Sequence, residues 1–210
     1  MTKIKFFLGA CVLFLNFSCS ENEIIDEKKA FDSKGLLIKV KTSLNSQKIN
    51  SRTEDGNFIS EAEAEASLDP AIVDAREYLL NNGFYAADLI EEFGSLSSPK
   101  LIILAMTYSE IEANSIPDSD GTPIFNIPSS WYENANAKVG EPGIGGCLLQ
   151  ALGVVEVMEW AAGKSFGTYA AKKALIKMVG STAARFGLGY IGVAIAIVQF
   201  TDCMGWTEFL

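Results

Sequence analysis

The chain has 210 residues and carries 17 Lys and Arg side chains against 26 Asp and Glu, for a formal net charge of −9. Such an acidic chain lacks the basic footprint that neutralises nucleic-acid phosphates, so we expect no nucleic-acid partner. The sequence contains no histidine, which excludes Ser-His-Asp and Cys-His nucleophiles and His-ligated zinc. We therefore expect a non-enzymatic protein without a cofactor or a metal site.

The composition changes along the chain. Residues 20–146 hold ten basic and 22 acidic side chains, whereas residues 147–210 hold five basic and four acidic ones and are rich in glycine and alanine. Apolar residues make up 49% of the whole chain, which is enough for a substantial core. The contrast predicts an acidic part followed by a self-contained helical module.

The N-terminus has the pattern of a secretory signal. Lys3 and Lys5 precede an apolar run over residues 6–17, which is followed by Ser18 and Cys19. Basic residues, a short apolar segment and a small residue before a cleavage point are typical of such signals. The run is shorter than the roughly 20 residues of an ordinary membrane-spanning helix. The segment therefore predicts export of the chain.

A cysteine directly after a small residue, at the end of this apolar run, resembles the lipobox of bacterial lipoproteins. Ser20, followed by Glu21 and Glu23, is similar to the export tag of lipoproteins that reach the outer surface of Gram-negative cells. The resemblance implies that residues 1–18 are removed and that Cys19 carries a lipid. It also implies a surface-exposed protein of the cell envelope, anchored to the outer membrane by a lipid that does not span it. A simple secretory peptide with an incidental cysteine is the alternative.

The segment after the signal is expected to be a polar tether over residues 19–59. Within it, apolar and polar residues alternate over 36–42, which predicts a short strand.

An acidic helical domain is predicted over residues 60–113. Its first helix is expected to begin at Asp69 as the N-cap, with Pro70 at the first helical position, and to end at Gly83. The Glu-Ala alternation over 61–66 also favours helix by propensity.

Two further helices follow in this domain. The second is expected to end at Gly94 and the third to begin at Ser98 and Pro99. Their inward-facing residues are predicted from helical spacing: Ala86, Leu89, Ile90 and Phe93 in the second, and Leu101, Leu104, Tyr108 and Ile111 in the third.

Residues 114–146 are rich in proline and glycine and are predicted to be a linker or surface loop, held to the core by Phe125, Trp131 and Tyr132. Residues 118–122 match the short nucleophile motif of the haloacid dehalogenase phosphatases. That motif must follow a buried apolar strand, which the preceding residues cannot form, so we interpret it as a polar Asx-type turn.

The last segment, residues 147–210, is predicted to be a module of three helices over 148–162, 165–186 and 190–203. In an oxidising envelope its two cysteines, Cys147 and Cys203, most simply form a disulfide. The whole chain is therefore expected to be all-α, with a small helical domain and a Gly/Ala-rich three-helix module closed by one disulfide.

A basic stripe runs along the middle helix of this module. Lys173, Lys177 and Arg185 lie on one side of the predicted helix, and Lys172 lies just off the stripe. A solvated face is one interpretation. Contact with anionic lipid headgroups, or with a partner, is the other.

Gly145 and Gly146 directly precede the module, which resembles the double-glycine boundary of peptide bacteriocins with their Gly- and Ala-rich, mildly cationic helices. The resemblance implies cleavage at this boundary and a membrane-active module whose stripe is masked by the acidic region until release. The alternative is a structural or protein-interaction lipoprotein of the cell surface, in which the same helices form an ordinary core.

Overall fold

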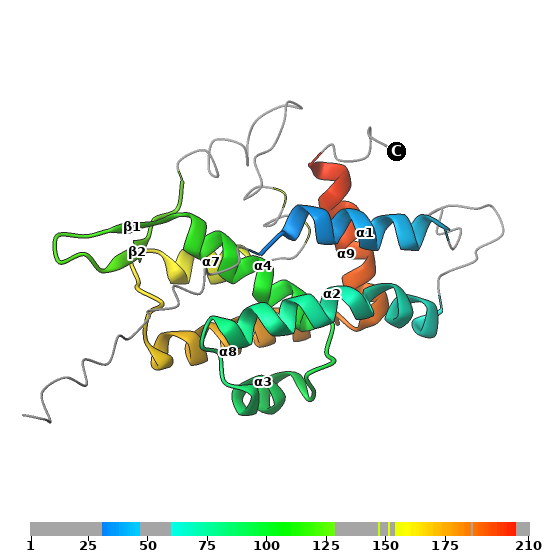
Figure 1. Cartoon of the computed structure of the whole chain (residues 1–210), viewed down its shortest axis with the longest axis horizontal. Helices are drawn as coiled ribbons and strands as arrows, with labels where there is room; N and C mark the ends of the chain where they lie inside the picture. The colour runs from blue at the N-terminus through cyan, green and yellow to red at the C-terminus, as the bar shows by residue number, and fades with distance from the viewer. Residues whose placement is uncertain are drawn as a thin grey trace, which may run out of the picture.

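The computed structural model describes residues 31–46, 60–128, 147, 151, 154–185 and 187–204. Helices dominate this part of the chain, and a two-stranded hairpin is its sheet (Figure 1). The expected all-α class is confirmed. Cys19, Trp131, Tyr132, Gly145 and Gly146 lie outside the described residues.

The first helix, α1 (Ser33–Ser46), occupies the position where a strand was predicted, so the strand over 36–42 is wrong. Its buried apolar residues are Leu36, Leu37, Val40 and Leu44. Offsets of one, four and eight residues place these side chains on one face of a helix, a period that the short alternating window did not reveal. The carboxylate of Asp32 accepts a hydrogen bond from the Gly35 amide, as N-cap side chains do.

Helix α2 (Glu61–Asn81) begins nine residues earlier than predicted, with Ser60 as its N-cap where Asp69 was expected, and Pro70 lies inside it. The start at Asp69 is therefore wrong. Ser60 and Glu63 form a capping box, in which Ser60 accepts from the Glu63 amide and Glu63 accepts from the Ser60 amide. This pair satisfies two backbone donors of the first turn, so the helix begins at the stronger signal.

Helices α3 (Ala86–Phe93) and α4 (Lys100–Ala113) confirm the other two predicted helices of this region. Gly94 ends α3 with a φ of 84°, a conformation that favours glycine. Ile90 is 46% exposed, so its inward placement is wrong; Leu89 and Phe93 make the buried contacts of α3. Helix α4 is buried nearly all round and lies at the centre of the core.

Strands β1 (Ser115–Pro117) and β2 (Pro123–Phe125) form an antiparallel hairpin that the sequence did not predict. Phe125 is fully buried, which confirms it as an anchor. Its amide donates to the carbonyl of Lys164, and its carbonyl accepts from the amide of Gly163. These two hydrogen bonds attach the hairpin to the turn that follows α7 (Val155–Ala161).

The expected disulfide is confirmed between Cys147 and Cys203, with the two Cα atoms 5.6 Å apart. Cys203 ends helix α9 (Tyr190–Cys203), which has its predicted bounds. Helix α8 (Tyr169–Arg185) begins four residues later than predicted, directly after Thr168, whose hydroxyl accepts from the Ala171 amide as an N-cap side chain does. Phe166, before this start, is buried and packs on Trp160. Residues 148–150, 152 and 153 lie outside the described part, so the expected helix over 148–162 is seen only in its second half, as α7.

One hydrophobic cluster runs through both parts of the chain. Helix α9 packs on α1 and α2, while α8 packs on α3, α4 and α7. Figure 1 shows α1 crossing α9, so that segments far apart in the sequence lie side by side. Lys41 of α1, a buried lysine, donates to Asp202 of α9 at 2.6 Å and fixes this crossing.

Removing the disulfide is expected to destabilise the protein. The bond joins residues 56 apart, and loop-closure entropy for such a loop corresponds to about 4 kcal/mol. The double variant Cys147→Ala/Cys203→Ala should lose about this free energy of unfolding in urea denaturation. A reductant should lower the stability of the parent chain and leave that of the variant unchanged; equal stability of parent and variant would contradict the expectation.

The capping box of α2 is a second stability determinant. Ser60→Ala removes the hydroxyl that accepts from the Glu63 amide and should cost about 1 kcal/mol. Urea denaturation of this variant measures the loss. Thr42→Ala is a suitable control, since the Thr42 hydroxyl donates only to a carbonyl within its own helix; the two variants should differ.

Candidate functional site

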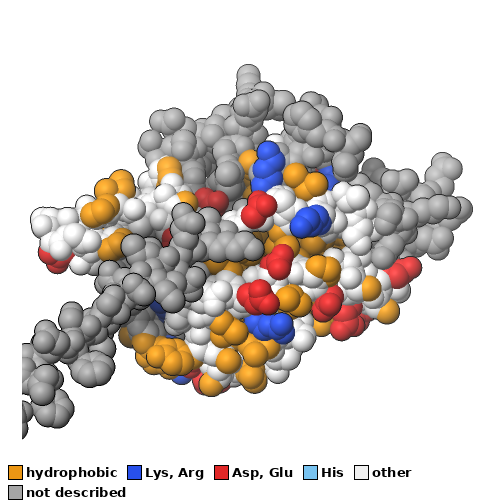
Figure 2. Space-filling model, in the orientation of Figure 1, with side chains coloured by type: hydrophobic (Ala, Val, Ile, Leu, Met, Phe, Trp, Pro, Cys, Tyr) orange, Lys and Arg blue, Asp and Glu red, His pale blue; other side chains and the backbone are white. Residues whose placement is uncertain are grey.

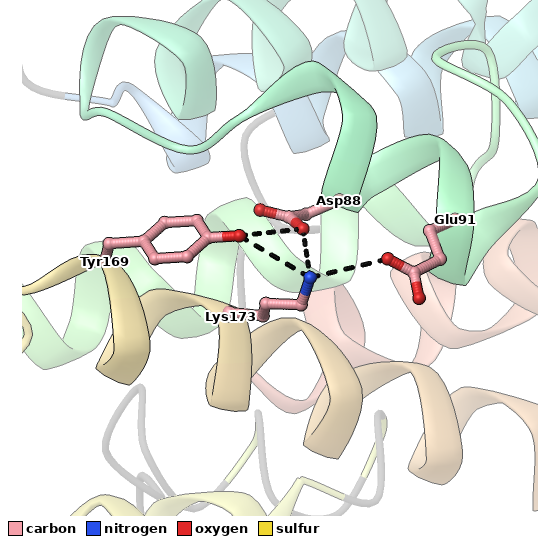
Figure 3. Close-up of polar contacts among 4 residues, drawn as sticks. All are labelled: Asp88, Glu91, Tyr169 and Lys173. Carbon is pink, nitrogen blue, oxygen red and sulfur yellow. Dashed lines mark hydrogen bonds and ion pairs between the residues drawn. The ribbon is translucent and has the colours of Figure 1, made fainter.

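Three of the four basic side chains of α8, those of Lys172, Lys173 and Arg185, are held by other parts of the chain. Lys173 donates to Asp88 at 2.6 Å and lies 3.5 Å from Glu91, both on α3 (Figure 3). Arg185 pairs with Glu156 of α7 at 2.7 Å, with both side chains mostly exposed. Lys177 is exposed, and its charge contributes to the lowered pKa of Asp88. The predicted stripe therefore exists, and at Lys173 and Arg185 carboxylates neutralise it.

Lys172 has a different task from its neighbour. Its ammonium group donates to the carbonyl of Asn82, the C-cap residue of α2, at 2.6 Å. The same group lies 5.8 Å from the centre of the Phe84 ring. A cation at a helix C-terminus satisfies an unpaired carbonyl and interacts favourably with the helix dipole. Lys172 thus fastens α8 to the end of α2.

Asp88 is the centre of the polar cluster between α3 and α8. Its side chain is only 8% exposed, and one oxygen, Oδ1, accepts from Lys173 and, at 3.2 Å, from the hydroxyl of Tyr169. The hydrogen bond from Lys173 lowers the pKa of Asp88, and the Tyr169 hydroxyl adds to this effect against the opposing cost of burial. The Asp88 contact in turn raises the pKa of Lys173. Both groups are therefore charged near neutral pH.

An open hollow of about 210 Å³ lies beside this cluster, lined by Tyr85, Ala87, Asp88 and Tyr169. The rings of Tyr85 and Tyr169 meet edge to face, with centroids 5.0 Å apart and an interplanar angle of 89°. The two residues are 59% and 50% exposed. Figure 2 shows hydrophobic side chains gathered at the lower edge of the molecule, where α3 and the start of α8 lie. The hollow is therefore open to solvent and is lined by two aromatic residues and a carboxylate.

The motif over residues 118–122 has the structure of a turn. Asp118 Oδ1 accepts from the amides of Asp120 and Thr122, and Gly121 has a φ of 83°. The preceding strand, β1, is three residues long and largely exposed. The Asx-type interpretation is confirmed, and the buried strand that the phosphatase motif requires does not precede it. Across the described ranges, no three His, Cys, Asp or Glu side chains come together in a way that could hold a metal ion.

Sequence reasoning found the cations of α8 and missed the residues that face them. Tyr85 is the N-cap of α3 and Asp88 lies in its first turn. Asp88 and its partner Tyr169 are 81 residues apart in the sequence. Leu89 lies four residues after Tyr85, at helical spacing, so no local signal indicated that the Tyr85 ring meets Tyr169 instead. The proposed cleavage boundary at Gly145 and Gly146 and the lipid site at Cys19 stay predictions.

Comparison of the chain with protein-family models, with curated proteins and with solved structures finds no match. Among the helices that the structure describes, none alone has the length and apolar character to cross a bilayer. Helices α8 and α9 would meet such a requirement only when taken together, and they are bent by 97° at the break between them.

The Asp88–Lys173 pair should make stability depend on pH in acid. Because the pKa of folded Asp88 lies below its ordinary value of 3.8, the pair stabilises the fold above that value and loses this contribution as the pH falls through the folded-state pKa. Asp88→Asn should therefore lower the unfolding temperature at neutral pH. The difference from the parent chain should shrink below about pH 4.

Thermal unfolding followed by circular dichroism across this pH range measures the effect. Glu156→Gln is the matched control, because its exposed partner Arg185 contributes little to stability. A difference between Asp88→Asn and the parent chain that stays constant in acid would contradict the expectation.

Proposed function

We propose that the chain is an exported, lipid-anchored and non-enzymatic protein of the cell envelope, whose helices serve as the core of a structural or protein-interaction domain. The observation that carries this proposal is the burial of α9. Val193, Ala194, Ile197 and Phe200 are each at most 2% exposed and belong to the same hydrophobic cluster as α1, α2 and α4.

This packing bears on what the last third of the chain does. Fully burying an Ile or Phe side chain contributes about 1.5–3 kcal/mol, and separating α9 from α1 and α2 would return several such groups to water. The carboxylates of α3 and α7 also occupy Lys173 and Arg185. Both facts support a role in which these helices stay part of the fold, with the lipid on Cys19 as the contact to the membrane.

A second candidate is the bacteriocin-like function, in which residues 147–210 are released and act on anionic membranes. The bent pair of α8 and α9 favours it, since together they reach the length and apolarity of a span. The ion pairs from α3 would then mask the basic stripe before release. This candidate requires cleavage at Gly146 and disruption of the shared core.

Expression of the full chain in a Gram-negative host separates the two candidates. Mass spectrometry of membrane and medium fractions should find the intact chain from Cys19 onward in the membrane, with a lipid on Cys19 and the disulfide closed. Added protease should digest it on whole cells, because the protein is expected to face outward.

Cys19→Ser is the matched variant, and it should leave the membrane fraction while keeping the fold. A disulfide-closed fragment beginning after Gly146 in the medium would overturn the proposal in favour of the second candidate. If the parent chain carried no lipid, the lipid anchor would be ruled out and the protein would be a secreted one.

A further inference from the structure

The carboxylate of Asp88 has one oxygen that can still accept a hydrogen bond at the hollow. Asp88 uses Oδ1 for both of its hydrogen bonds, and in the described part of the chain its Oδ2 has no partner. Figure 3 shows this second oxygen pointing away from Lys173. The Asp88 side chain is only 8% exposed, but Oδ2 is not one of the buried atoms without a partner: in the described part of the chain that atom is Asn82 Oδ1. Oδ2 therefore lies at the open hollow, where it can accept from a donor of water or of a ligand.

Lys173 cannot supply that donor. Its ammonium group has three N–H bonds, and three oxygens surround it: Asp88 Oδ1 at 2.6 Å, Glu91 Oε2 at 3.5 Å and the Tyr169 hydroxyl at 3.5 Å. The lysine is therefore committed to holding α3 on α8. What the hollow offers to a ligand is an acceptor oxygen and the two half-exposed tyrosines, Tyr85 and Tyr169. Tyr169 already has the Lys173 ammonium group 5.9 Å from its ring centre, so Tyr85 is the ring without a cation of its own in the described part of the chain.

Tyrosine rings and a carboxylate both attract cations. The face of a tyrosine ring is the negative end of its quadrupole and attracts ammonium and guanidinium groups. The carboxylate of Asp88 attracts the same groups and can accept their N–H bonds. Lys173 lies between Asp88 and Glu91, and the charge of Lys177 also acts on Asp88, so the charges of the cluster itself nearly balance. The chain as a whole carries a charge of −9, which favours a cationic over an anionic partner.

We propose that the hollow formed by Tyr85, Asp88 and Tyr169 binds the cationic head of a lysine or arginine side chain on a partner protein. This rests on the proposed function, because it names the chemistry by which an interaction domain at the cell surface would recognise its partner. The tyrosines enclose the alkyl stem and face the charge, and Asp88 Oδ2 accepts from the cation. The Asp88–Lys173 pair keeps the carboxylate in place and ionised.

Titration of the exported full chain with short peptides tests this. The probes are the N-acetylated amides Gly-Arg-Gly and Gly-Lys-Gly, with Gly-norleucine-Gly as the uncharged match of the lysine peptide, followed by NMR shifts of the tyrosine ring protons. We expect saturable binding of both cationic peptides that weakens with added salt, and no saturable binding of the norleucine peptide.

Tyr85→Ala and Tyr169→Ala should each weaken binding about two- to fivefold, since each removes one cation–π wall. Tyr85→Phe keeps the ring face and should bind like the parent chain. Ile116→Ala is the matched control: this side chain is 61% exposed, much like Tyr85 at 59%, but lies on the hairpin. It should leave binding unchanged.

Equal binding of the norleucine peptide would overturn the proposal, as would no binding of either cationic peptide to the folded chain. Loss of binding in Ile116→Ala as large as in Tyr85→Ala would overturn it too. Saturation by a neutral disaccharide in place of the cationic peptides would identify a polyol site instead. None of these results depends on lipidation or cleavage, so the proposed function stands or fails separately in the fractionation experiment.

Discussion

The packing of α9 against α1 and α2 is the constraint on which the rest of the structure depends. Helix α9 has no charged side chain before Asp202, so it is stable in water only where other helices cover it. Its neighbour α1 comes from the other end of the described chain, and Lys41 and Asp202 join the two at their crossing. A short turn joins the end of α8 to the start of α9, so the position of α9 also limits where α8 can lie. In that position the basic side chains of α8 face α3 and α7.

Local signals in the sequence predicted much of the fold. The stops at Gly83 and Gly94, the start of α4 near Ser98 and the bounds of α9 are set by backbone preferences of a few residues, so they could be read without knowing the fold. The disulfide was predictable because Cys11 lies in the expected signal and Cys19 is the expected lipid site, so Cys147 and Cys203 leave one pairing.

The errors arose where two local signals competed or where distant helices decided the outcome. Asp69 and Pro70 form a valid helix start, but the capping box at Ser60 satisfies more backbone donors and comes first. The face of α1 was misread because seven residues are too few to separate a strand period from a helix period. Ile90 fits the apolar face of α3 by spacing, and only the position of α8 shows that this face turns partly to solvent.

Only the half of the candidate site that lies on α8 could be predicted from the sequence. Charge spacing reveals Lys173 on α8, but its partner Asp88 lies 85 residues earlier and is brought near by packing alone. The same holds for the two tyrosines, whose rings meet although they come from separate elements. Sites built between helices in this way carry no continuous sequence pattern, since neither half has a function without the other.

The hydrogen bonds between Phe125 and the residues after α7 have a bearing on proteolysis. The disulfide lies entirely on the C-terminal side of Gly146, so it would not join the two pieces of a chain cut there. Phe125 nevertheless sits fully buried with its backbone bonded to Gly163 and Lys164. A nicked molecule would therefore run as two bands on a denaturing gel and still sediment as a single particle, and scission by itself would not set the tail loose.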